Sequence, residues 1–199
     1  VRGIVVHDSE VIGNDVSASV LNECYSNAIG IYSFRSVIQE NTVWVDDHTS
    51  CGLDYNSSNY QHLYYYSVGI MSLASERSRS VISNNTIDAN GASNAIRASY
   101  ADVYSNDMLT SHNSNDHYAI YSQGYTDIQS NVVSDFRYGF ELRGGSTSII
   151  GNDLEVRNRG LYGSEISGDY LIEDNTFNKT TNSGDWLIDV RNASTVAVR

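Results

Sequence analysis

Hydrophobic positions in this chain recur in a short unit that is repeated along almost its whole length. Each unit has an apolar residue, two spacers, an asparagine, one spacer and a second apolar residue. The seven copies are Val11–Asn14–Val16, Ile38–Asn41–Val43, Ile82–Asn85–Ile87, Val103–Asn106–Met108, Ile128–Asn131–Val133, Ile149–Asn152–Leu154 and Ile172–Asn175–Phe177. Successive asparagines are 27, 44, 21, 25, 21 and 23 residues apart. Such a period, with local insertions, predicts a solenoid in which each repeat is one turn.

A second apolar segment follows each asparagine at a variable distance. It opens with a small residue and an apolar one, as in Gly30-Ile31, Ala95-Ile96 and Gly139-Phe140. Each repeat therefore carries three apolar segments, all too short for helices. Leucine-rich repeats have a similar period, but they need a helical segment and several Leu per repeat. The pattern favours three short parallel strands per turn, with neighbouring turns about 4.8 Å apart.

The repeated asparagines have a structural explanation. A sharp bend between two strands needs a residue that tolerates the left-handed region, and Asn tolerates it best after Gly. Stacked Asn amides can also hydrogen-bond from one turn to the next and satisfy buried turn groups. We therefore interpret the seven asparagines as scaffold and not as a site.

With these motifs the chain resembles the right-handed parallel β-helix family, which includes pectate lyases, mannuronan epimerases, phage tailspikes and periplasmic carbohydrate-binding proteins. The motif is specific for the fold and unspecific for activity. The resemblance implies an all-β right-handed parallel β-helix of about eight coils with an Asn ladder. Residues 1–199 would form a single domain, part of a longer chain or assembly, with a long loop insertion at residues 42–68. Repeat residues run from Ile4 to Val198 without a capping helix, so trimers or end-to-end polymers are further expectations.

The charge of the chain limits its partners. The formal net charge is −12, and Lys179 is the single lysine in the sequence. An acidic surface of this size argues against nucleic acid or an anionic membrane as the main partner. No window approaches about 18 consecutive apolar residues, so the sequence predicts no membrane span.

The two cysteines occupy equivalent places in adjacent repeats. Cys24 follows Asn14 by ten residues, and Cys51 follows Asn41 by ten residues. Equal offsets would stack the two side chains within disulfide range. We predict a Cys24–Cys51 disulfide and an extracellular, cell-surface or virion-surface location. Two stacked free thiols are the alternative.

The outer face of the first strand of each coil is the predicted groove floor, because side chains alternate along a strand. The outward row would be Tyr32, Met71, Arg97, Tyr121, Glu141, Tyr162 and Asp189, followed two residues later by Phe34, Leu73, Ser99, Gln123, Arg143, Ser164 and Arg191. Tyr rings stack on sugar rings, and Arg binds hydroxyls or carboxylates. From this row we predict Tyr32, Arg97, Tyr121, Arg143 and Tyr162 as substrate-binding residues. Alternatively, Tyr on an exposed strand reflects strand propensity alone.

Loops on the same side supply candidate proton-transfer pairs. Asp47 lies beside His48, and Asp116 lies beside His117. An Asp next to a His can orient it and raise its pKa toward neutrality. The alternative is that both histidines are solvated and idle.

Known β-helix chemistries match this sequence only in part. The Asp-Pro-His-Glu signature of the epimerases is absent, and so is the Gly-His-Gly of polygalacturonases. Pectate-type lyases bind Ca²⁺ through carboxylates and use Arg or Lys as base, so Ca²⁺ with Glu141 is one interpretation. We expect an extracellular polysaccharide-binding protein that acts as a lyase, hydrolase or epimerase or only binds, with Glu141 as acid or metal ligand. The alternative is a non-enzymatic subunit of a phage tail, adhesin or filament.

Overall fold

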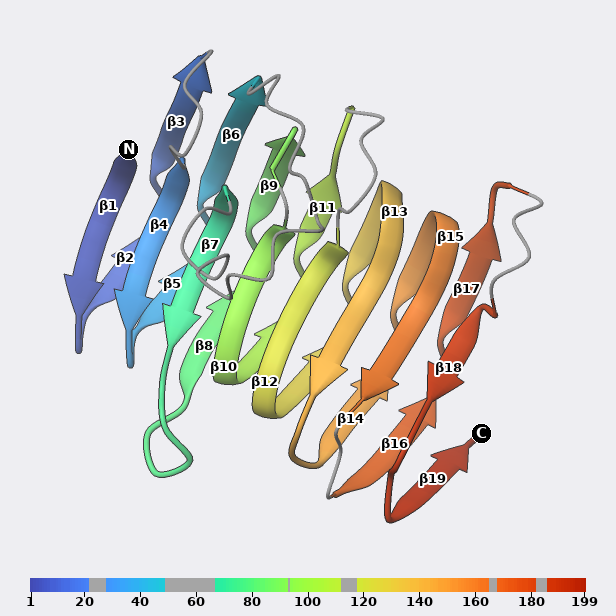
Figure 1. Cartoon of the computed structure of the whole chain (residues 1–199). Helices are drawn as coiled ribbons and strands as arrows, with labels where there is room; N and C mark the ends of the chain where they lie inside the picture. Colours follow the sequence, from blue (N-terminus) through green and yellow to red (C-terminus); the bar gives the residue numbers. More distant parts are fainter. Residues whose placement is uncertain (22–27, 49–66, 93, 112–117, 165–167, 182–185) are drawn as a thin grey trace, which may run out of the picture.

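The protein is built from β-strands stacked in successive turns (Figure 1). The computed structural model describes residues 1–21, 28–48, 67–92, 94–111, 118–164, 168–181 and 186–199. In these ranges every regular element is a strand. No helix that could cross a membrane occurs in the same ranges.

The first three turns each contain three separate strands. They are β1 (Arg2–His7), β2 (Glu10–Ile12) and β3 (Asp15–Leu21), then β4 (Ile29–Phe34), β5 (Val37–Gln39) and β6 (Thr42–His48), then β7 (Val68–Leu73), β8 (Ser80–Ser83) and β9 (Thr86–Asn90). Strand β1 pairs in parallel with β4, β2 with β5, and β3 with β6. Each strand thus lies on the equivalent strand of the next turn.

Later strands continue around the corners of the coil. The remaining elements are β10 (Asn94–Tyr104), β11 (Asp107–Leu109), β12 (Tyr118–Gln129), β13 (Val132–Arg143), β14 (Thr147–Ile150), β15 (Asp153–Ser164), β16 (Asp169–Glu173), β17 (Thr176–Lys179), β18 (Ile188–Val190) and β19 (Thr195–Val198). Strand β13, for example, begins beside β11 and ends beside β12. The predicted parallel β-helix is therefore confirmed.

Three parallel sheets run along the solenoid. The first-strand sheet stacks β1, β4, β7, β10, β12, β13, β15 and β18, which face the viewer in Figure 1. The third-strand sheet stacks β3, β6, β9, β11, β13, β15 and β17. The second-strand sheet contains the segment of each turn that lies between the first and third strands along the chain. Strands β18 and β19 have no third strand after them in the described ranges. The complete turns are therefore slightly fewer than the eight expected.

The asparagine ladder is present as predicted. Asn131 donates from its backbone N to Asn152 Oδ1 at 2.9 Å and from Nδ2 to the same oxygen at 3.0 Å. Its Nδ2 also lies 3.0 Å from the Val103 carbonyl of the preceding turn. The same amide-to-amide bonds link Asn14, Asn41, Asn85, Asn106, Asn131, Asn152 and Asn175 in one column.

The left-handed residue at this corner is not the ladder asparagine, contrary to expectation. The residue before it has the positive φ, for example 58° at Glu40, 56° at Ser105 and 54° at Ser130. The side chain of the ladder Asn is needed for the amide column, so the bend falls one position earlier. That position accepts several residue types: Gly13, Glu40, Asn84, Ser105, Ser130, Gly151 and Asp174.

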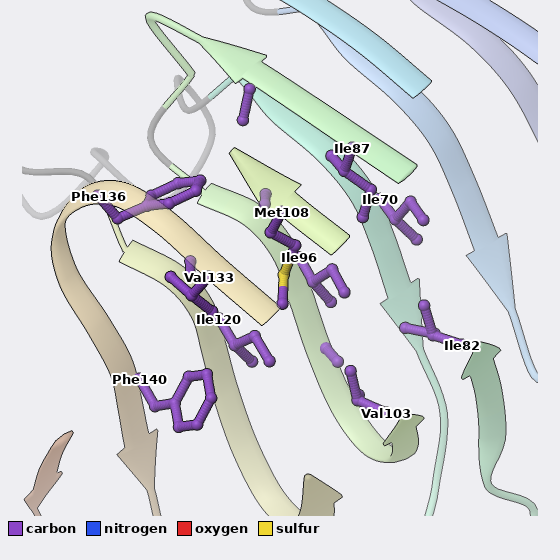
Figure 2. Packing of buried hydrophobic residues seen from close by; sticks show 14 of the residues in the cluster. Ile70, Ile82, Ile87, Ile96, Val103, Met108, Ile120, Val133, Phe136 and Phe140 are labelled. Carbon is purple, nitrogen blue, oxygen red and sulfur yellow. The ribbon is translucent and has the colours of Figure 1, made fainter. Parts of the chain in front are cut away.

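Side chains from all three sheets fill the interior of the coil. Figure 2 shows Ile96, Ile120 and Phe140 of the first strands beside third-strand residues such as Met108 and Val133. The small residue that opens each first strand makes room for the third strand. A Cβ on Gly30 would lie 2.4 Å from Val43 Cγ1 and 2.6 Å from the carbonyl oxygen of Gly69.

Two expectations concern the segment between the second and third turns. Residues 42–48, the start of the loop expected at residues 42–68, form strand β6, and Val68 begins β7. Residues 49–66 of that segment lie outside the described residues. Cys51 is one of them, and Cys24, between the first and second turns, is also outside the described residues, so the disulfide stays a prediction.

Candidate ligand-binding face

The predicted outward row of the first-strand sheet is continuous in the structure. Tyr32 is in register with Met71, Met71 with Arg97, Arg97 with Tyr121, Tyr121 with Glu141, Glu141 with Tyr162, and Tyr162 with Asp189. These residues therefore form one line of side chains parallel to the solenoid axis, as the strand alternation predicted.

This face has two halves of different chemistry. In the first three turns its half-buried side chains are Tyr32, Phe34, Met71 and Leu73. From β10 onward the same rows carry arginines, tyrosines and acids. We call the outward residues of β10, β12, β13, β15 and β18 the polar half. Of the predicted binding residues, Arg97, Tyr121, Arg143 and Tyr162 lie in the polar half, and Tyr32 lies two turns before Arg97.

Guanidinium groups lie over the tyrosine rings of the polar half. Tyr121 has the Arg97 guanidinium carbon 4.9 Å and that of Arg143 5.6 Å from its ring centroid. Arg97 comes from the turn before Tyr121 and Arg143 from the turn after it. The rings therefore already make cation–π contacts, which stabilise both partners. A sugar ring that stacked on these tyrosines would therefore compete with the guanidinium groups for the ring faces.

Each acid of the polar half binds the arginine two residues further along its strand. Glu141 is 3% exposed and accepts hydrogen bonds from Arg143 Nε at 2.8 Å and Nη2 at 2.7 Å. Asp189 accepts from Arg191 Nε at 3.0 Å and Nη2 at 2.7 Å. The side chains of Arg143 and Arg191 are still 43% and 60% exposed. The acids thus hold two exposed arginines in fixed positions.

The Asp189–Arg191 pair changes the titration of both groups. Hydrogen bonds from Arg191, partly opposed by burial, lower the pKa of Asp189 below the ordinary value for an aspartate. The same bonds raise the pKa of Arg191. Asp189 is therefore ionised near neutral pH, where it positions Arg191 and does not donate a proton.

We expect the Asp189 carboxyl to titrate below the range of an ordinary aspartate in ¹³C-detected NMR. Because the folded pKa is depressed, the pair stabilises the fold above the unfolded pKa and loses this contribution as pH falls through the folded pKa. Arg191→Gln should raise the pKa of Asp189, and Arg35→Gln, remote from this pair, should leave it unchanged. An Asp189 pKa at or above the ordinary value in the unsubstituted protein would contradict the assignment.

A third row of this sheet was not predicted, and its members Ile29, Val68 and Asn94 are buried. It contains Arg2, Ile29, Val68, Asn94, Tyr118, Tyr138 and Arg159, in register from turn to turn. Tyr118 and Tyr138 stack at 4.9 Å, and Arg159 lies 4.7 Å from the Tyr162 ring centroid. The signal was available, since these residues precede the inward apolar residue by two positions. The small residue between them obscured the alternation, because it faces inward as well.

The predicted catalytic residues do not meet at one point in the described ranges. Asp47 is the second-last residue of β6 in the second turn and accepts a hydrogen bond from Ser67 Oγ at 2.5 Å. Glu141 is at least three coil spacings away, about 14 Å along the axis. The backbone of His48 belongs to β6, but its side chain is outside the described residues, and so are Asp116 and His117.

Two aspartates that the sequence analysis did not single out as a pair, Asp46 and Asp88, lie near each other on the third-strand sheet. Asp46 accepts a hydrogen bond from Asn90 Nδ2 at 2.9 Å. Burial, and to a smaller extent the nearby Asp46 carboxylate, raise the pKa of Asp88. Across the ranges that the structure covers, no group of three or more His, Cys, Asp or Glu could hold a metal ion. This result covers the described residues only, so Ca²⁺ binding stays a prediction.

The first-strand sheet differs in charge from the rest of the molecule. Its outward positions carry five arginines: Arg2, Arg97, Arg143 and Arg159 in the described strands, and Arg191 directly after β18. They carry two acids, Glu141 and Asp189. The whole chain has a net charge of −12. This face is therefore cationic on an acidic protein and is suited to an anionic ligand.

Comparisons with protein-family models, curated proteins and solved structures found no match for this chain. The structure supports the parallel β-helix fold, and the comparisons lend no support to membership in the pectate lyase, epimerase or tailspike families.

Proposed function

We propose that this protein binds an anionic polysaccharide along the polar half of the first-strand sheet, outside a cell or on a cell or virion surface. The observation that carries the proposal is the placement of four outward arginines, Arg97, Arg143, Arg159 and Arg191, against two acids in the polar half of a protein of net charge −12. The polysaccharide lies along a line of side chains that continues from turn to turn. The carboxylate or sulfate groups of the sugars pair with the guanidinium groups of the protein.

Fixed arginines make this face a better binding surface than mobile ones would. Arg143 and Arg191 each use Nε and one Nη for the acid partner, and their side chains are 43% and 60% exposed, so a ligand can reach them. Holding a side chain in its binding geometry removes an ordering cost of about 0.5–1.5 kcal/mol per side chain on association. Planar guanidinium groups also suit bidentate contacts to carboxylates or sulfates.

Binding fits the polar half better than proton transfer does. Asp189 is kept ionised by Arg191, and a general acid must be protonated near the working pH. The Tyr162 position separates Glu141 from Asp189 along the row. We therefore propose binding as the function of this face; lyase, hydrolase or epimerase activity would need a second group from another element.

The double variant Arg97→Gln/Arg191→Gln should bind a polyuronate about tenfold or more weakly, since hydrogen bonds between charged groups contribute about 1.5–3 kcal/mol each. The matched control Arg35→Gln/Arg79→Gln removes the same charge from outside the polar half and should change affinity less than about twofold. Isothermal titration calorimetry, with and without Ca²⁺, measures both, and melting curves verify folding. Equal losses in the two double variants would show non-specific attraction and overturn the proposal.

A further inference from the structure

From β12 onward, two outward rows of the polar half repeat every two turns, whereas the scaffold repeats every turn. Strand β12 presents Tyr121 and Gln123, β13 presents Glu141 and Arg143, β15 presents Tyr162 and Ser164, and β18 presents Asp189, with Arg191 directly after the strand. Arg97 and Ser99 on β10 precede this repeat. A turn with a tyrosine and a neutral polar residue thus alternates with a turn with an acid and an arginine.

Contacts in the two units match. Tyr121 has the next turn's Arg143 at 5.6 Å, and Tyr162 has the next turn's Arg191 at 5.6 Å. In both units the acid accepts from the Nη2 of its arginine at 2.7 Å.

A further guanidinium lies over each ring, at 4.9 Å for Arg97 on Tyr121 and 4.7 Å for Arg159 on Tyr162. These two arginines occupy different positions, one on the preceding turn and one on the same strand as the ring. Both tyrosine rings therefore contact a second guanidinium, although the arginine that supplies it occupies a different position in each unit.

The fold does not require this two-turn period. The asparagine column and the inward apolar residues recur in every turn. In the first three turns the same outward row contains Val5, Tyr32 and Met71, without alternating charge. The scaffold contacts therefore do not account for the two-turn period.

We propose that the polar half selects a linear polysaccharide with an alternating disaccharide repeat that carries one anionic group per two sugars. This inference rests on the proposed function and specifies its ligand. Two turns span about 9.6 Å, twice the 4.8 Å strand spacing, which is similar to the length of two linked pyranose rings. The charged sugar lies on the turn with the acid-bound arginine. The neutral sugar lies on the turn that presents a tyrosine hydroxyl and Gln123 or Ser164.

A homopolymeric polyuronate fits this face less well. It places a carboxylate on every turn, including the turns where Gln123 and Ser164 offer no charge and where Glu141 or Asp189 lies on the adjacent turn. The Tyr162 turn does carry one cation, Arg159, but its guanidinium lies over the tyrosine ring. Like-charge contacts of this kind disfavour the wrong partner.

The test compares octasaccharides of hyaluronan and unsubstituted chondroitin, which alternate, with octagalacturonate, which has a carboxylate on every sugar. Calorimetry should show at least one alternating octamer binding about tenfold or more tightly than octagalacturonate, although it carries half the charge. Equal or tighter binding of octagalacturonate would overturn the inference and leave the proposed function standing. No binding of any octamer, or of the corresponding full-length polymers, would overturn both.

Added cations on the neutral turns provide a second test. Gln123→Arg/Ser164→Arg should reduce the preference for the alternating octamer to about threefold or less, because each tyrosine turn then accepts a carboxylate. Gln123 is exposed, so the added side chain has room. Gln129→Arg adds a cation to an exposed position of the second-strand sheet and should leave the preference unchanged. An unchanged preference in the double variant would contradict the two-turn assignment.

Discussion

Replacing Asn131 with alanine should lower the free energy of unfolding by about 3–6 kcal/mol, because several buried polar groups each lose a partner worth about 1–3 kcal/mol. Asn131 Oδ1 accepts from the backbone N and from Nδ2 of Asn106, at 3.0 Å in both cases. Its Nδ2 lies 3.0 Å from the carbonyl oxygens of Val103 and Gln129. Alanine supplies neither the acceptor nor the donor, and three of these four hydrogen bonds are buried.

Urea denaturation of Asn131→Ala measures this loss. Asn178→Ala is the matched control, since Asn178 is an exposed asparagine on β17 of the third-strand sheet. Its change should stay within about 0.5 kcal/mol, as for most surface substitutions. If the two variants lost similar stability, the amide column would not be what holds the turns in register.

Phe140→Ala should cost about 3–5 kcal/mol, the usual range for truncating a buried aromatic side chain. Phe140 is 1% exposed and stacks in register between Ile120 and Leu161 (Figure 2). It lies directly before Glu141 on β13, so the cavity opens beneath the polar half. We therefore expect weaker polysaccharide binding as well as lower stability.

Phe34→Ala is the control for this truncation. Phe34 belongs to the first-strand sheet too, but it lies half-buried on the outside, beside His7 and Arg35. Its loss should cost about 1 kcal/mol, because only part of its surface is removed from water. A Phe34→Ala variant as unstable as Phe140→Ala would contradict the assignment of inward and outward rows.

The fold was predictable from sequence because every turn needs the same residue type at the same position. An amide is required at Asn106, Asn131 and Asn152 for hydrogen bonding between turns, and few other side chains satisfy it. The left-handed residue was not predictable, since Glu40 and Ser105 meet the same φ requirement as Gly13. A requirement for one backbone conformation alone restricts the residue type only weakly.

The ligand-binding face was only partly predictable, for a related reason. Strand alternation located Arg97, Glu141 and Arg143, because their outward position follows from the inward residue beside them. Sequence reasoning missed Arg159, whose place depends on the inward-facing small residue that follows it. It also could not show that Arg143 is bound to Glu141, since that depends on side-chain geometry.

The central claim is that the arginines of the polar half contact an anionic polysaccharide, and arginine Nε–Hε NMR tests it most directly. On addition of a hyaluronan octasaccharide, the resonances of Arg97, Arg143, Arg159 and Arg191 should shift together with one dissociation constant. Those of Arg35 and Arg79, which are paired with Asp8 and Asp102 elsewhere, should stay in place. Shifts confined to Arg35 and Arg79, or none at all with any anionic octamer, would contradict the account.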